Sequence, residues 1–292
     1  MKIIRLYSYG KINLFLDVKN KLENGYHSIR TVMQSISLYD EIQLIPLNDD
    51  NKILIECNYP SIPLDEKNTC HKAASYIKEK YHINSGIIIK INKNIPSEAG
   101  LAGGSSNSAA IVKGLNKLWQ LRLSDEELLS IGVKIGADVP FCINGGTYLA
   151  EGIGEKLTKL NDFKWDNILL IKPDFSMSTA FVYKNLTQDS YNLYTDNKTI
   201  HYIDSGDHFN AAKSSANTLE RVVEKFHPEI SLIKSIMLRH GAVSSLMTGS
   251  GSAVYGLFPD TKSLDTAYEA FKGDCTQVHK VSTNAFGIEI FD

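Results

Sequence analysis

Residues 96–110 read PSEAGLAGGSSNSAA, and this stretch decides the fold. It lies between a β-branched run, GIIIKI at 86–91, and IVKGLNKLW at 111–119, whose apolar residues follow a helical period. The order is therefore a buried strand, a loop rich in glycine, and a helix that we expect to start at Ser105 or Ser106.

The small residues suit this loop to anion binding. Gly100, Gly103 and Gly104 leave the backbone N–H groups open to close approach. A helix start adds unpaired N–H donors and the positive end of its dipole. The hydroxyls of Ser105 and Ser106 could ligate a magnesium ion carried by nucleotide phosphates. From the pattern alone, a glycine-rich turn with a serine N-cap is an equally good interpretation.

Composition describes an ordinary globular protein. The chain has 292 residues, 43% of them hydrophobic and 22% charged, which allows two domains or one large one. Lys and Arg number 31 against 33 Asp and Glu, a formal net charge of −2. This balance is not that of a general binder of nucleic acid or membrane surfaces, so neither is expected as a partner.

The cysteines and the apolar pattern predict a cytoplasmic protein. No apolar run of 18 residues occurs, and the N-terminal stretch is broken by Arg5 and Lys11, unlike a signal peptide. The cysteines are scattered without zinc spacing, so we expect reduced core residues. They are Cys57, Cys70, Cys142 and Cys275.

The first half predicts mixed α and β structure. Short strands are expected at 2–8, 12–18, 32–38, 41–46 and 86–91, and helices at 69–80 and 125–135. Ser124 and Glu127 form a capping box at the start of the second helix, and Gly136 suits its end.

The second half has a looser pattern. Strands are expected at 168–171, 246–247 and 253–258, a helix at 227–240, and a long loop or irregular helices at 184–209. The pattern loosens around 150–166, so we place an N-terminal domain at 1–158 and a C-terminal domain at 159–292.

Common nucleotide and hydrolase motifs are absent. The chain has no G-x-x-x-x-G-K-[ST], no G-x-G-x-x-G after a strand, no G-x-S-x-G and no H-E-x-x-H. The phosphate loop is therefore neither of the Walker nor of the Rossmann type.

Three ordered motifs resemble those of the GHMP kinase superfamily. PSEAGLAGGSSNSAA resembles its ATP-binding motif, with GKINLFLDV (10–18) before it and LMTGSGSAVYG (246–256) after it. The resemblance implies an α+β fold of two domains, an N-terminal α/β domain of a ribosomal-protein type and a ferredoxin-like α+β C-terminal domain. It also implies ATP with Mg²⁺, and a loop at 248–252 that packs against the phosphate loop. The expected ATP-binding residues are Pro96, Ser97, Glu98, Ala99, Gly100, Leu101, Ala102, Gly103, Gly104, Ser105 and Ser106, with Lys93 and Asn68 near the adenosine.

The resemblance also assigns a catalytic pair. By spacing alone, Asp138 in GADVP is a cap or turn residue, followed by a chain that Pro140 should keep extended, and Lys11 is an edge-strand charge. By resemblance, Asp138 is the base that accepts the substrate hydroxyl proton. Lys11 then pairs with it and keeps the carboxylate ionised.

Two further segments indicate the acceptor. GYH (25–27) and GADVPF (136–141) resemble superfamily members that phosphorylate a cytidine diphosphate alcohol in the non-mevalonate isoprenoid pathway. By that resemblance Tyr26 and Tyr183 stack on the cytosine, His27 bonds its edge, and Asn13 contacts the substrate. The expected partner is this small molecule, and the expected state is a monomer or homodimer.

Some positions depart from the family pattern. Ser97, Glu98 and Ala99 stand where many members have glycine, and Ser252 and Ala253 stand in place of Pro-Thr. Gly10 replaces a common Ala and Thr218 an acid, while Asn217 and Glu220 match a structural helix start. Another small-alcohol kinase of the superfamily, or a nucleotide-binding protein without catalysis, remains an alternative. Tyr26, His27 and Tyr183 argue against the first, and retention of Lys11 and Asp138 against the second.

Overall fold

The computed structural model describes residues 3–47, 51–273 and 277–291. Of the four cysteines, Cys275 lies outside the described residues. The other three are free thiols, with Cys70 and Cys142 buried and Cys57 half-buried, as expected.

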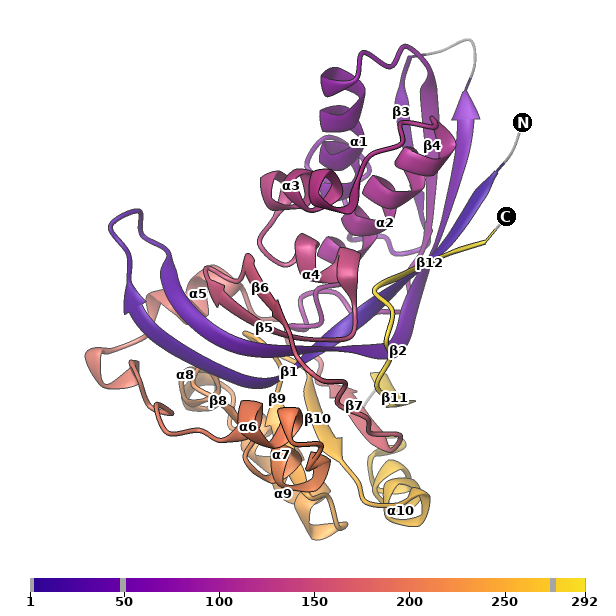
Figure 1. Ribbon diagram of the computed structural model, residues 1–292. Coiled ribbons are helices and arrows are strands. Elements are labelled where there is room, and N and C mark those ends of the chain that lie inside the picture. Colours follow the sequence, from indigo (N-terminus) through magenta and orange to yellow (C-terminus); the bar gives the residue numbers. More distant parts are fainter. Residues whose placement is uncertain (1–2, 48–50, 274–276, 292) are drawn as a thin grey trace.

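The larger sheet is built around two long strands, β1 (Ile4–Lys21) and β2 (His27–Leu47). Its order is β12-β1-β2-β4-β3, with β5 beside β2, β6 beside β5, and a short parallel β8 beside β1. The further strands are β3 (Ile53–Cys57), β4 (Gly86–Asn92), β5 (Thr147–Gly152), β6 (Lys156–Lys159), β8 (Ala216–Asn217) and β12 (Ile288–Phe291). In Figure 1, β1 and β2 sweep across the whole molecule between its two halves.

The prediction of four short strands before residue 47 is wrong. The strands expected at 2–8 and 12–18 form one continuous strand, β1, and those expected at 32–38 and 41–46 are both part of β2. The β1–β2 register shifts between Tyr9 and Lys11, between Asn13 and Phe15, and again near Val18. Such bulges bend a strand and increase its twist without ending it. The shift between Tyr9 and Lys11 falls in the gap between the strands expected at 2–8 and 12–18, whereas the shift after Asn13 lies inside the second of them.

Four helices pack on one side of this sheet (Figure 1). They are α1 (Thr69–Lys80), α2 (Gly103–Leu118), α3 (Asp125–Ile135) and α4 (Val139–Asn144). Ile89 of β4 and Ile111 and Leu115 of α2 share one buried core with them. Two expectations are wrong here. α2 starts at Gly103, not at the serines, and Pro140 lies in the first turn of α4, where a proline is tolerated, instead of keeping the chain extended.

A second sheet of four antiparallel strands has the order β11-β7-β10-β9. Its strands are β7 (Ile168–Lys172), β9 (Ser244–Met247), β10 (Val254–Leu257) and β11 (Gln277–Val281). Its larger helices are α8 (Glu220–Phe226), α9 (Glu229–Arg239) and α10 (Thr261–Phe271). The 184–209 region holds short helices, as expected. The pieces are α5 (Thr179–Lys184), η1 (Gln188–Ser190), α6 (Thr199–Asp204) and, just beyond, α7 (His208–Lys213).

The boundary at 158/159 stays a prediction. β6 of the larger sheet ends at Lys159, beside that boundary. Two later strands, β8 and β12, return to pair with β1. The chain therefore passes from the larger sheet to the smaller one and comes back.

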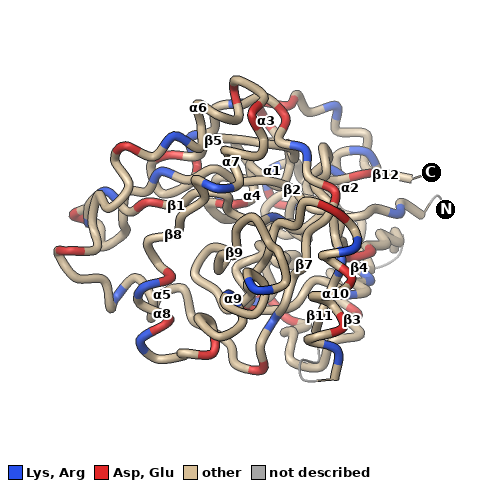
Figure 2. The backbone as a smooth tube through the Cα atoms, turned by 90° about the horizontal axis from the view of Figure 1, so that it is seen from below, with Lys and Arg blue, Asp and Glu red and all other residues tan. Residues whose placement is uncertain are grey.

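Charge is spread evenly over the molecule. Figure 2 shows Lys and Arg interspersed with Asp and Glu around the outline instead of gathering on one side. Within the described ranges, no helix is both long and apolar enough to cross a bilayer.

The capping box of α3 offers a test of how its first turn is held. Ser124 Oγ accepts from the N–H of Glu127 at 3.3 Å, and Glu127 Oε2 accepts from the N–H of Ser124 at 2.9 Å. We expect Ser124→Ala to lower the free energy of unfolding by about 1 kcal/mol in urea denaturation. Ser130→Ala, at an exposed interior position of the same helix, should cost nothing. Equal losses in both variants would contradict this role of Ser124.

Candidate active site

A cleft of about 1280 Å³ runs between the glycine loop, the β1–β2 strands and α5. It is lined by every site residue expected from the sequence except Ser106. Residues from positions 11 to 251 thus meet around one cavity. Its volume exceeds the roughly 300–1,000 Å³ of a pocket for one small ligand.

The glycine loop keeps its first helical donors free. Ala102, the residue before α2, has a left-handed backbone (φ 55°) and makes no side-chain cap, so the N–H groups of the first turn have no partner within the helix. Glu98 also has a positive φ of 51°, a costly conformation for a non-glycine residue. The buried Ser97 hydroxyl finds no partner among the described residues. These free polar groups make the loop a candidate anion cradle.

The two serines at the start of α2 differ. Ser106 is fully buried, and its hydroxyl donates to the carbonyl oxygen of Tyr9 at 2.7 Å. Ser105 is half-buried and lines the cleft. Of the two candidates for a magnesium ligand, only Ser105 therefore faces the cavity.

Lys11 is held at the floor of the cleft by neutral oxygens. Its side-chain nitrogen donates to Asn13 Oδ1 at 2.6 Å and to the carbonyl oxygen of Gly100 at 2.7 Å. Burial lowers the pKa of Lys11, and the nearby Asp138 carboxylate opposes that shift. No ion pair joins Lys11 to a carboxylate in the part of the chain that the structure describes. The expected Lys11–Asp138 pair is thus a through-space attraction, without direct contact.

Asp138 presents a free carboxylate to the cleft. It occupies the N-cap position of α4 but makes no side-chain cap, so the simpler interpretation as a capping residue fails. Its charge acts in two directions, opposing the fall in the pKa of Lys11 and helping burial to raise the pKa of Tyr183. The Asp138 carboxylate is therefore close enough to act on both Lys11 and Tyr183, which line the same cleft.

The aromatic end contains the residues expected to bind cytosine. The rings of His27 and Tyr183 lie 5.2 Å apart between centroids. Burial, helped by Lys21, lowers the pKa of His27 and keeps its imidazole neutral at pH 7. Tyr26 lines the same cleft and is 61% exposed, and the ring pairs of His27 among the described residues are with Tyr183 and Tyr191. Tyr191, which the motifs did not indicate, has its hydroxyl 3.4 Å from His27 Nε2.

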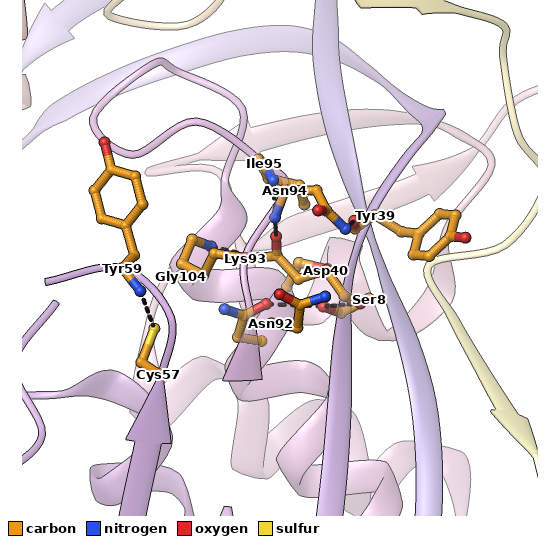
Figure 3. Close-up of polar contacts among 12 residues, drawn as sticks. Ser8, Tyr39, Asp40, Cys57, Tyr59, Asn92, Lys93, Asn94, Ile95 and Gly104 are labelled. Carbon is orange, nitrogen blue, oxygen red and sulfur yellow. Dashed lines mark hydrogen bonds and ion pairs between the residues drawn. The ribbon is translucent and has the colours of Figure 1, made fainter. Parts of the chain in front are cut away.

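Lys93 and Asn68, which were expected near the adenosine, also line the cleft, and both side chains already bind other protein groups. Asn68 caps α1, accepting from the N–H of Cys70 at 2.9 Å. Lys93 forms an ion pair with Asp40, and both side chains are almost entirely buried. Asp40 Oδ1 also accepts from the N–H groups of Asn94 and Ile95, at 2.7 and 2.8 Å. Figure 3 shows Asp40 bound to Asn94 and Ile95, just after the end of β4.

Sequence reasoning missed the residues that hold these groups in place. Asp40, Thr31 and Tyr191 lie outside the three motifs, and Thr248 was noticed only as part of a loop. Asp40 carried a weak signal as an acid after the apolar strand pattern of 32–38. For Thr31 the sequence gives none.

Comparison with known proteins shows the family to which the chain belongs. Models of the GHMP kinase N-terminal and C-terminal domains match residues 68–146 and 200–276. The 4-diphosphocytidyl-2-C-methyl-D-erythritol kinase of Clostridioides difficile is 44% identical over 292 residues, 99% of this chain and 98% of its own. The chain belongs to the GHMP kinase family. The three motifs and the two-domain α+β fold expected from them are thereby confirmed.

Other relatives of this GHMP kinase agree. The kinase of the same name from Alkaliphilus oremlandii is 44% identical, over 99% of this chain and all of its own. A crystal structure of a 4-(cytidine 5'-diphospho)-2C-methyl-D-erythritol kinase matches with a TM-score of 0.81 and 26% identity, over 96% of this chain and 99% of that one. Homoserine kinase from Cytophaga hutchinsonii, at 20% identity and a TM-score of 0.80 over 100% and 98% of the two chains, shares the fold.

The buried ion pair beneath the glycine loop of this GHMP kinase should be costly to break. Asp40→Asn keeps an acceptor for both N–H groups but leaves the Lys93 ammonium buried without a counter-charge. We expect the free energy of unfolding, measured in urea, to fall by about 3–5 kcal/mol.

A matched control lies nearby. Glu56→Gln removes the carboxylate from an exposed pair with Lys90 of β4, the strand that ends just before Lys93. Its cost should stay below about 1 kcal/mol. If Asp40→Asn costs no more than Glu56→Gln, Asp40 does not hold the loop in the way described.

Proposed function

We propose that this GHMP kinase transfers the γ-phosphoryl group of ATP to the 2-hydroxyl of 4-diphosphocytidyl-2-C-methyl-D-erythritol, giving the 2-phosphate and ADP. One observation carries the proposal. A single cleft is lined by the glycine loop, by His27, Tyr26 and Tyr183, and by Asp138, whose carboxylate makes no cap hydrogen bond. The names of the full-length relatives support the same substrate.

The charge of the cleft suits two polyphosphate substrates. Apart from Lys93, which is paired with Asp40, its described lining includes the lysines at 11, 21, 67 and 184 but only two carboxylates, Glu98 and Asp138. In a chain with a formal charge of −2, this is a local excess of cations. Such a cleft attracts anionic ligands and offsets their mutual repulsion. A volume of about 1280 Å³ leaves room for both.

The glycine loop would hold the triphosphate. The free N–H groups at the start of α2, the Ser97 hydroxyl and the dipole of a 16-residue helix all favour an anion there. Among the described residues, no group of three or more His, Cys, Asp or Glu could hold a metal by itself. Ser105 therefore would meet a magnesium ion that the triphosphate brings, and such an ion neutralises phosphate charge.

Asp138 and Lys11 would act at the acceptor hydroxyl. Because the Asp138 carboxylate accepts no cap hydrogen bond, it is free to orient that hydroxyl and take its proton late in a loose transition state. The Lys11 ammonium, whose third N–H has no acceptor among the described residues, would offset charge that develops on the transferring group. In this proposal the positive charge of Lys11 stabilises the transferring phosphoryl group as well as the Asp138 carboxylate.

The aromatic end of the cleft would select a substrate that carries a cytosine base. A neutral imidazole offers one donor and one acceptor to the edge of a cytosine, and tyrosine rings offer stacking faces. Tyr26 is exposed enough to close on a base from outside, whereas Tyr183 is already packed against His27. A kinase of a small alcohol without a base has no use for this arrangement, which disfavours that alternative.

Two further lines of the proposal concern the cell. Free Cys57, Cys70 and Cys142 suit a reducing compartment, so we place the reaction in the cytoplasm. We propose that the enzyme works as a monomer or homodimer, with the cytidine substrate as its partner and neither nucleic acid nor membrane.

Substrate choice tests the proposal directly. In a coupled assay of ADP release, 4-diphosphocytidyl-2-C-methyl-D-erythritol should be phosphorylated far faster than homoserine, mevalonate or galactose at equal concentration. Tyr26→Ala should raise the KM of the cytidine substrate by roughly tenfold, from a stacking contact of about 1–3 kcal/mol, and leave the KM of ATP unchanged. Faster turnover of any of the other alcohols would sink the substrate assignment.

Asp138→Asn tests the chemistry. The variant keeps shape and hydrogen bonding but loses charge and basicity, so turnover should fall by roughly two to four decades. Nucleotide binding, followed by calorimetry, should be retained, because the glycine loop is untouched. If the variant keeps more than about a tenth of wild-type turnover, Asp138 is not the base.

A further inference from the structure

The Lys11 ammonium depends on the amide of Asn13 for one of its two acceptors. Both side chains are buried, and Asn13 Oδ1 lies 2.6 Å from Lys11 Nζ. A lysine has three N–H donors and no acceptor, so it can bond the oxygen of an amide but never its nitrogen. The direction in which the Asn13 amide points therefore decides where the ammonium sits.

Thr31 of β2 fixes that direction. Its hydroxyl donates to the carbonyl oxygen of Phe15 at 2.6 Å, which uses its only hydrogen. Toward Asn13, 2.8 Å away, Thr31 Oγ1 can therefore only accept, and the Asn13 atom facing it must be the Nδ2 donor. The oxygen of the same amide is then turned to Lys11.

Thr248, from the loop at 248–252, holds the other side of Asn13. Its Oγ1 accepts from the backbone N–H of Asn13 at 3.0 Å. Its own hydrogen is within reach of Asn13 Oδ1 at 3.3 Å and of the Gly100 carbonyl at 3.4 Å. These are the two oxygens that Lys11 also bonds.

We propose that Thr31 is a positioning residue for phosphoryl transfer, acting on Lys11 through the amide of Asn13. This inference rests on the proposed function only in assigning Lys11 to the transfer. Thr31 and Asn13 are 0% and 2% exposed. Without the Thr31 hydroxyl, the buried Nδ2 group loses its acceptor and must turn toward the cleft to find water. That rotation takes the amide oxygen away from the ammonium.

The inference also changes the role of Asn13. Its side-chain Oδ1 accepts from Lys11 and Thr248, and its Nδ2 donates to Thr31. Its main-chain carbonyl oxygen accepts from the Tyr255 hydroxyl at 2.9 Å. Asn13 lines the cleft, but its hydrogen bonds are directed into the protein. It acts as the link between the two threonines and the lysine.

Three variants test the role in catalysis. Thr31→Val keeps the shape of the side chain and removes the hydroxyl, so kcat should fall about tenfold or more with the KM of ATP unchanged. Thr31→Ser, which keeps the hydroxyl, should retain at least half of wild-type kcat. Thr147→Val removes an equally buried hydroxyl from neighbouring β5, outside the cleft, and should leave kcat unchanged even if it lowers Tm.

Three kinetic outcomes overturn the inference. They are a Thr31→Val variant within twofold of wild-type kcat, a failure of Thr31→Ser to restore kcat, and an equal loss in Thr147→Val. Each would show that the hydroxyl has no role beyond packing.

A measurement on the ligand-free enzyme separates this inference from the substrate assignment. The pKa of Lys11 can be followed by NMR titration of ¹³C,¹⁵N-lysine-labelled protein, with Lys11→Met identifying the signal. The titratable groups that act on this ammonium are Asp138 and Cys142, and neither changes in Thr31→Val. Loss of an acceptor should lower the pKa of Lys11 further, by about one unit.

An unchanged pKa of Lys11 in Thr31→Val would reject the inference whatever alcohol the enzyme phosphorylates. If Thr31→Val does not fold, Asn13→Ala carries the same titration, since it removes the amide oxygen directly. A Lys11 pKa that stays at its wild-type value in Asn13→Ala would be equally decisive against it.

Discussion

The backbone of Gly100 lies against the carbonyl oxygen of Thr248 with no room for a side chain between them. A Cβ atom on Gly100 would come within 2.0 Å of that oxygen, and the positive φ of 75° also calls for glycine. This contact joins the glycine loop of the first half of the chain to the third motif of the second half. Alongside it, the N–H of Ala253 donates to the carbonyl oxygen of Ala99 at 3.1 Å. The position of Lys11, which bonds the Gly100 carbonyl, depends on this contact.

The charges of the cleft are arranged for partners that come from outside. Lys93 is neutralised by Asp40 and belongs to the scaffold, whereas Lys11 is surrounded by neutral oxygens at hydrogen-bond distance. A buried cation in that setting interacts strongly with an incoming anion, because the free-energy cost of removing the ammonium from water is already present in the free protein. Lys93 thus stabilises the structure through its ion pair with Asp40, whereas the charge of Lys11 is left for an anionic ligand to neutralise.

Local chemistry explains which features the sequence could predict. The helix at 69–80, the capping box at Ser124 and the glycine loop each depend on residues within a few positions of one another. The bulges of β1 and the helical turn at Pro140 do not, since they follow from pairing with β2 and from packing of α4. In the site, the motifs supplied Lys11, Asp138 and the loop. Thr31 and Asp40 are ordinary strand residues until the fold brings Asn13 and Lys93 beside them, and the burial of Ser106 follows only from its contact with Tyr9.

The strand β12 has a consequence for how the protein folds, because it joins two distant parts of the sequence. It pairs with the first residues of β1, Arg5 opposite Phe291 and Ser8 opposite Ile288. The segment before it also touches α4, where Gly287 leaves no space for a Cβ atom beside the carbonyl oxygen of Cys142. Asp138 stands at the other end of that short helix. Arg5 and Phe291 are far apart in the sequence, so closing this contact carries a long loop-closure cost. The three motifs all precede β12 in the sequence, yet the support of α4 behind Asp138 is complete only when β12 has paired with β1.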